Sequence, residues 1–151
     1  MRRVVTGWSA DGKPILLFDG EPAHFDFGMV SSDEIWSTTA VPADSRRSDD
    51  PTSAGFVLEP PHGGTVCRIA SYRPGASVEL HATQTVDYVI VLAGELTMLY
   101  GDDEIVLRPG DIVVQQGTPH GWANRANTDC VVAAILLTAE GAAEREGLEW
   151  P

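Results

Sequence analysis

The chain has 151 residues, 43% of them hydrophobic, and its 22 acidic and 10 basic residues give a formal net charge of −12. This length and composition predict one globular domain with a single core and exclude an intrinsically disordered chain. The negative charge argues against nucleic acid and membrane surfaces as partners, because both bind positively charged proteins.

Cysteine content and hydropathy indicate an ordinary soluble protein. The two cysteines, Cys67 and Cys130, are too few and too isolated for a disulfide framework or a zinc ribbon. The longest apolar run, residues 130–137, is too short to span a bilayer, and the N-terminus lacks the apolar core of a signal peptide. We therefore expect a soluble, cytoplasmic protein.

Residues 1–60 are predicted to form an N-terminal arm that contains short strands. Residues 4–6 and 15–18 flank a Ser-Ala-Asp-Gly-Lys-Pro turn, a pattern typical of a hairpin, and residues 34–39 form a third strand candidate. Residues 41–54 are polar and predict a loop. Because unpaired strand edges favour association, we predict that this arm contacts a second copy of the chain in a homodimer.

Residues 61–140 have the pattern of an all-β barrel. Short apolar runs rich in β-branched residues alternate with turns that contain glycine and proline, which is typical of a sandwich or barrel. These runs are residues 65–72, 86–93, 96–100, 104–107, 112–114, 120–124 and 130–138. Residues 141–151 are left as a C-terminal tail, and only residues 139–148 have helical composition.

The segment 75–94 carries the most informative polar residues. His81, Thr83, Thr85 and Asp87 share one parity, so on a single strand they would line one face. Such a face is costly to bury without partners. Imidazole and carboxylate groups bind divalent transition metals, and His120, which follows a Gly-Thr-Pro turn, is a second imidazole. Two histidines and a carboxylate would suit a metal with open coordination positions.

Two motifs in the same order resemble those of the cupin superfamily. Gly75-x5-His81-x-Thr83-x3-Asp87-x6-Gly94 resembles its first motif, and Gly117-x2-His120-x3-Asn124 resembles the end of its second. The resemblance covers residues 65–138. It implies a double-stranded β-helix, the jelly-roll barrel, with a metal in its mouth. A closer likeness is to small bacterial and fungal cupins, some of which resemble polyketide-tailoring decarboxylases.

The resemblance implies a role for each site residue. His81, Asp87 and His120 would hold a divalent metal such as iron, zinc or manganese, although some cupins bind none. Thr83 replaces a family histidine and is expected to be a pocket hydroxyl. Gln115 replaces a family proline and could be a weak ligand or a hydrogen-bond donor to one.

Two further residues could line the pocket. Trp122 shares parity with His120, so its ring would form a pocket wall or part of the core. Arg68 shares parity with Tyr72. If the strand's other face packs inside, Arg68 is a solvated charge; if Arg68 points inward, it could bind a substrate carboxylate.

Together these residues predict a small metal-dependent lyase or isomerase that acts on a carboxylated or oxygenated organic molecule. The metal would stabilise an enolate formed by decarboxylation, dehydration or a proton shift, with His81, Asp87 and His120 at the catalytic centre. A non-haem iron dioxygenase is the first alternative, because the same ligands suit ferrous iron. A non-catalytic or metal-free small-molecule-binding protein is the second.

Overall fold

The structure is a computed structural model that describes residues 1–141, so the predicted tail from residue 142 onward lies outside the described residues. Within residues 1–141 no helix is long and apolar enough to cross a membrane. The elements in chain order are β1 (Arg3–Trp8), β2 (Pro14–Gly20), β3 (Ala23–Asp26), β4 (Val30–Thr38), a 3-10 turn η1 (Pro51–Ala54), β5 (Thr65–Tyr72), β6 (Ser77–His81), β7 (Thr85–Ala93), β8 (Leu96–Tyr100), β9 (Asp103–Leu107), β10 (Ile112–Gln116), β11 (His120–Ala123) and β12 (Cys130–Thr138).

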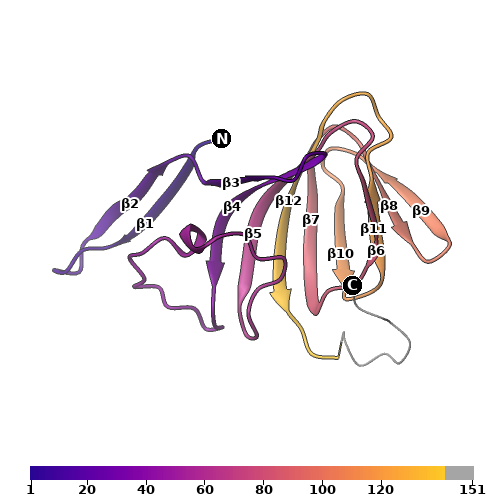
Figure 1. Cartoon of the computed structure of the whole chain (residues 1–151). Helices are drawn as coiled ribbons and strands as arrows, with labels where there is room; N and C mark the ends of the chain where they lie inside the picture. Colours follow the sequence, from indigo (N-terminus) through magenta and orange to yellow (C-terminus); the bar gives the residue numbers. More distant parts are fainter. Residues whose placement is uncertain (142–151) are drawn as a thin grey trace.

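Two sheets form the barrel (Figure 1). One has six strands in the order β10-β7-β12-β5-β4-β3, and the other has four in the order β6-β11-β8-β9. All pairings between neighbouring strands are antiparallel. This arrangement confirms the predicted all-β jelly-roll barrel, and the predicted strands 65–72, 96–100 and 130–138 coincide with β5, β8 and β12.

The core lies between the two sheets and follows from the period of two along each strand. On β5 the side chains of Val66, Arg68, Ala70 and Tyr72 are buried, whereas the residues between them are only partly buried. Arg68 therefore points inward. The sequence left two orientations open, and the one in which Arg68 is a solvated charge is wrong. The reason is that the face with Cys67 and Ile69 covers the outside of the sheet, where neither residue is fully buried.

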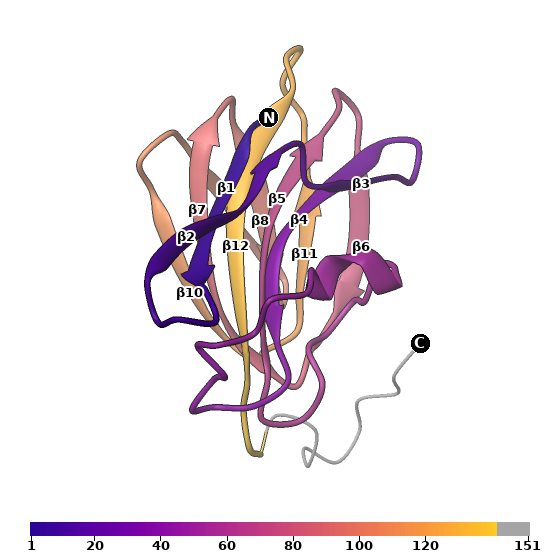
Figure 2. The same ribbon diagram turned by 90° about the vertical axis from the view of Figure 1, so that its left-hand side faces the viewer.

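The hairpin β1–β2 stands apart from the barrel as a two-stranded sheet. In Figure 2 it lies in front of the six-stranded sheet. The buried Arg3 anchors it, because its guanidinium forms an ion pair with Asp50 and hydrogen bonds to Thr52 and Ile35. Of the predicted arm, residues 1–60, the strands β3 and β4 extend the barrel sheet through β5, while the hairpin does not. The contact with a second copy stays a prediction.

The prediction that residues 81–87 line one face of a single strand is wrong. The chain ends β6 at His81 and begins β7 at Thr85, so residues 82–84 carry it from the four-stranded sheet to the six-stranded one. Side-chain alternation holds only within one strand. His81 and Asp87 therefore approach the interior from opposite sheets.

Gly94 makes the turn between β7 and β8 possible. Its φ is +75°, and a Cβ atom there would lie 2.3 Å from the Asp129 carbonyl oxygen and 2.8 Å from Cys130 Cα. Backbone atoms cannot yield as a flexible side chain can, so this position requires glycine.

We expect Gly94→Ala to lower the free energy of unfolding by more than about 2 kcal/mol, because strain and steric overlap add. Gly101→Ala is the matched control, since Gly101 also has a positive φ (+57°) but an added Cβ would meet nothing within 4 Å. It should cost about 1 kcal/mol. Urea unfolding of both variants measures the difference, and equal losses would contradict the close-approach argument.

Candidate active site

A cavity of about 290 Å³ lies between the two sheets. Its walls are mainly apolar and include Val89, Trp122, Val132 and Leu136, while a smaller set of polar groups faces the same space. The polar set is Ser32, Arg68, Tyr72, His81, Thr83, Asp87 and His120. An apolar cavity with a few convergent polar groups is the usual form of a small-molecule site.

His81 and His120 face each other at the neighbouring edges of β6 and β11. They are register partners in the four-stranded sheet, and their ring centroids are 4.4 Å apart with the planes inclined at 51°. Nδ1 of His81 donates to the Glu79 carbonyl oxygen and Nδ1 of His120 to the Thr118 carbonyl oxygen, each at 2.9 Å. Because a carbonyl only accepts, Nδ1 carries a proton in both rings, and in a neutral ring this leaves Nε2 as the acceptor.

His120 is neutral at physiological pH. Only 3% of its surface is exposed, and burial lowers its pKa from 6.5 to about 4. Its ring also contacts the edge of Trp122, with centroids 5.6 Å apart. His81, by contrast, is only half-buried, so it borders both the cavity and solvent.

Gln115 does not line the cavity but supports His120 from behind. Its side-chain amide donates to the carbonyl oxygen of Thr118 and, at 2.9 Å, to the Thr118 hydroxyl. The same carbonyl accepts the Nδ1 proton of His120. Gln115 at the end of β10 and His120 at the start of β11 therefore share the Thr118 carbonyl as acceptor. Through this carbonyl Gln115 positions His120 without touching the cavity.

Asp87 is buried in the wall of the cavity on β7, where it is the register partner of Gln115 on β10. Its Oδ1 has no hydrogen-bond partner among the described residues, and the same is true of Gln115 Oε1. Burial raises the pKa of Asp87, and the charge of Arg68 acts in the opposite direction. Nearby, the buried Thr85 hydroxyl donates to Thr83 at 2.7 Å, so Thr83 is a pocket hydroxyl that already has a partner.

The three predicted metal ligands line one cavity but do not meet as a cluster. Among residues 1–141, no three His, Cys, Asp or Glu side chains are placed to hold a metal ion. His81 and His120 fit two coordination positions, which is one fewer than open catalytic sites usually take from the protein. Asp87 lines the same cavity, and its role as the third ligand stays a prediction.

Arg68 forms a buried ion pair that the sequence did not reveal. Its Nε lies 3.3 Å from Glu34 Oε1 on the neighbouring strand β4, and Ser32 donates to the same oxygen at 2.7 Å. The guanidinium also donates to the Val57 carbonyl oxygen at 2.5 Å and lies 4.7 Å from the centroid of the Phe56 ring. Burial lowers the pKa of Arg68, and Glu34 counteracts this effect.

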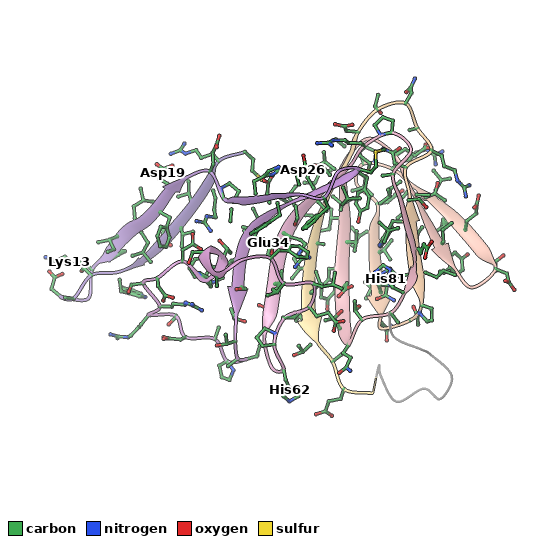
Figure 3. All side chains as sticks on the ribbon, in the orientation of Figure 1. Lys13, Asp19, Asp26, Glu34, His62 and His81 are labelled. Atoms are coloured by element: carbon green, nitrogen blue, oxygen red, sulfur yellow. The ribbon has the colours of Figure 1, made fainter. Side chains whose placement is uncertain are left out.

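Glu34 could have been suspected as an inward-facing residue, because it lies in a predicted strand at even spacing from Ser32. The sequence could not identify Arg68 as its partner. Figure 3 shows Glu34 and His81 in different parts of the barrel body, while the exposed His62 lies at one end. The predicted pocket residues Arg68, Thr83 and Trp122 all line the cavity.

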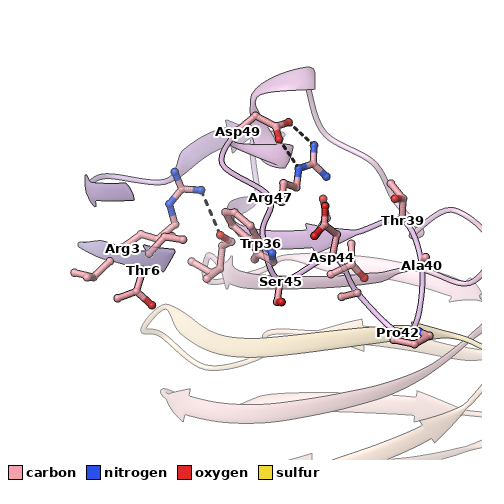
Figure 4. Close-up of a pocket in the computed structure, with 16 residues that line it drawn as sticks. Arg3, Thr6, Trp36, Thr39, Ala40, Pro42, Asp44, Ser45, Arg47 and Asp49 are labelled. Atoms are coloured by element: carbon pink, nitrogen blue, oxygen red, sulfur yellow. Dashed lines mark hydrogen bonds and ion pairs between the residues drawn. The ribbon is translucent and has the colours of Figure 1, made fainter. Parts of the chain in front are cut away.

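A second and larger cavity, about 840 Å³, lies between β1, β4 and the segment 39–49 (Figure 4). Its two arginines are already paired: Arg47 binds Asp49 through two contacts, and Arg3 binds Asp50. None of the described residues that line it is a histidine. The smaller cavity, where imidazoles and buried charges converge, is therefore the candidate active site.

Comparison with known proteins gives the same fold. A family profile described as "Cupin domain" matches residues 68–136. The chain is 35% identical over 135 residues to "Phomopsin biosynthesis cluster protein C'" of Diaporthe leptostromiformis. The aligned region covers 83% of this chain and 71% of that protein. It is 32% identical over 144 residues to a "cupin-domain-containing oxidoreductase" of Aspergillus ruber, covering 89% and 70%.

A solved structure from Klebsiella pneumoniae, described as an uncharacterized conserved protein with a double-stranded β-helix domain, is similar with a TM-score of 0.54. The match covers 77% of this chain and 83% of that one at 16% identity. At this identity the likeness concerns the fold alone.

We expect the burial of His120 to make stability depend on pH. Between the folded pKa of about 4 and the ordinary 6.5, the folded protein binds fewer protons than the unfolded chain. The corresponding stability, about 3 kcal/mol, is present above pH 6.5 and lost as pH falls towards 4. Urea unfolding of wild type and His120→Asn across this range should show the wild-type stability falling relative to the variant. His62→Asn is the exposed control, and a constant difference would contradict the prediction.

We expect Gln115→Ala to lower the free energy of unfolding by about 1 to 3 kcal/mol, because the buried Gln115 side chain no longer donates to Thr118. The neighbouring Gln116 is exposed, so Gln116→Ala is the matched control and should change stability by less than about 0.5 kcal/mol. Chemical denaturation of both measures this. Equal effects would mean that Gln115 does not support the turn.

Proposed function

This chain belongs to the cupin superfamily, and we propose that it is an enzyme that moves a proton on a small oxygenated organic molecule, in a reaction of lyase or isomerase type. The observation that carries the proposal is the histidine pair. Two imidazoles, each with Nδ1 engaged by a carbonyl, present Nε2 acceptors in a cavity whose walls are largely apolar. Positioned histidines are the commonest general acids and bases.

The two histidines have different surroundings and therefore different roles. His81 is half-buried, so it can take a proton from a bound molecule and pass it to solvent. His120 is buried and neutral, with a pKa of about 4, and its Nε2 accepts a hydrogen bond that orients the substrate. The guanidinium of Arg68, in the same cavity, supplies positive charge near an oxygen that becomes negative as the proton leaves.

The residues that line the cavity do not support covalent catalysis by a cysteine. Neither Cys67 nor Cys130 lines the cavity, and burial raises the pKa of the Cys130 thiol to about 11, which disfavours a thiolate nucleophile. The same His81 and His120 would hold a divalent ion such as iron, zinc or manganese, with Asp87 nearby. Such an ion would supply Lewis-acid stabilisation of an enolate. The proton transfer described above uses only the protein's own groups.

An oxidoreductase is the second candidate, and the printed name of the Aspergillus ruber relative favours it. An oxidation must consume an electron acceptor such as dioxygen, whereas a proton shift, dehydration or decarboxylation consumes none. Oxygen uptake therefore separates the two candidates.

We expect His81→Asn and His120→Asn each to lower turnover by about 10²-fold or more, because each removes an imidazole from the reacting groups. The assay incubates the protein with small hydroxylated aromatic ketones and acids in deuterated water and follows deuterium incorporation and product formation by NMR. Dissolved oxygen is recorded with an electrode, and metal content by elemental analysis of the same sample.

Deuterium incorporation without oxygen uptake supports the lyase or isomerase. Stoichiometric oxygen uptake supports the oxidoreductase instead. Unchanged turnover in both variants, with His62→Asn as the exposed control, would remove the histidine pair from the mechanism. Binding without any conversion would favour a non-catalytic binding protein.

A further inference from the structure

We infer that the outer face of the six-stranded sheet and the hairpin β1–β2 together form a surface that binds a second copy of this chain. The predicted homodimer thereby gains a specific interface, which is the face of a sheet rather than its strand edges. This surface lies on the outside of the barrel, so its role is independent of the reaction proposed for the cavity.

The outward side chains of β5, β7, β12 and β10 form a continuous apolar face. Strand register arranges them in adjacent rows across the four strands: Val114, Tyr88, Ile135 and Cys67 in one row, and Ile112, Ile90, Ala133 and Ile69 in the next. Tyr88, Val114 and Ile112 are 42%, 52% and 62% exposed. Contiguous exposed apolar surface of this kind marks an interaction site, whereas single exposed apolar residues do not.

No outward charge interrupts this face among the described residues of the four strands. The charged residues of β5, β7, β10 and β12 are Arg68 and Asp87, and both line the cavity on the inner side of the sheet. The chain as a whole has a net charge of −12. A basic partner would find no carboxylate to bind on this face, whereas a second negatively charged copy can approach it without bringing like charges together.

The hairpin β1–β2 projects on the side of the molecule where this face lies. Figure 2 shows it in front of the six-stranded sheet, with the four-stranded sheet behind. The hairpin pairs with no other described strand, and its side chains Val4, Trp8, Ile15 and Leu16 are 39% to 55% exposed. Because an isolated two-stranded hairpin is only marginally stable in water, these side chains require cover.

One copy of the chain does not provide that cover. The cavity of about 840 Å³ separates β1 from β4, so the hairpin stands away from its own sheet. Two copies related by a twofold axis can each pack the hairpin against the other copy, which covers both hairpins and both faces in one closed assembly. The arm and the face are present on every copy, so a second copy is the partner that satisfies both.

The area of the surface fits a dimer only when both parts contribute. Strands about 4.8 Å apart, with about 3.3 Å per residue, give β5, β7, β12 and β10 roughly 500 Å² of sheet plane. A stable specific interface buries about 800 Å² on each partner. The face alone is smaller than this, and the hairpin supplies the remaining area.

The test is analytical ultracentrifugation of the full chain over an approximately hundredfold range of concentration, in which a reversible dimer dissociates on dilution by mass action. We expect the wild type to sediment as a dimer at the upper end of this range. Hydrogen exchange at both ends of the range should show the backbone amides of β1 and β2 protected in the dimer and exchanging faster after dilution.

Charge substitutions at exposed positions test both parts of the surface. Tyr88→Glu and Val114→Glu place charges on the face, and Leu16→Glu places one on the hairpin. Each should raise the dimer dissociation constant by about 100-fold or more, because the twofold axis doubles every added charge within an apolar interface. Ile105→Glu on β9 is the matched control, since Ile105 is 48% exposed but belongs to the other sheet, and it should leave the dissociation constant unchanged.

A melting curve of each variant establishes that it is folded, and Val114→Glu decides for the face if Tyr88→Glu does not fold. A wild type that is monomeric at about 100 µM would overturn the inference and leave the face to a different protein. A dimer that survives in the folded face variants would place the interface elsewhere. A dimer that survives only in Leu16→Glu would exclude the hairpin and overturn the joint surface.

Discussion

The interior of this barrel depends on the buried ion pair between Arg68 and Glu34. Removing two charges from water is costly, and the cost is recovered only when each finds partners. Here β4 and β5 are neighbours, so the pair forms directly across two strands. Ser32 donates to Glu34 and Arg68 donates to the Val57 carbonyl, while Arg68 Nε has no hydrogen-bond partner among residues 1–141. The pair closes one side of the cavity and determines how much positive charge a ligand can meet there.

The opposite side of the cavity depends on backbone carbonyls. Glu79 and Thr118 accept the Nδ1 protons of the two histidines, and Gln115 donates to the same Thr118 carbonyl. These contacts choose the tautomer of each ring and direct both Nε2 atoms away from the backbone. The neutral state of His120 then follows from burial, so the chemistry of the site is largely a consequence of how the two sheets enclose it.

The fold was largely predictable, because its evidence is local. Strands such as 65–72 and 130–138 are read from short apolar runs between glycine and proline turns, and Gly94 falls where a positive φ is required. The site was predictable in part: His81, Thr83, Asp87, His120 and Trp122 line one cavity. Glu34 was not predicted as a site residue, because its partner Arg68 is 34 residues away along the chain and only strand pairing brings them together.

The sequence by itself determined the all-β class, the order of the strands along the chain and the positions of the motif residues. Each of these depends on neighbours within a few residues. Only the tertiary structure decided that Arg68 points inward, that His81 and Asp87 reach the cavity from different sheets, and that Gln115 contacts Thr118 rather than the cavity. Alternation along a strand defines two faces but not which of them is inside; the packing of one sheet against the other makes that choice.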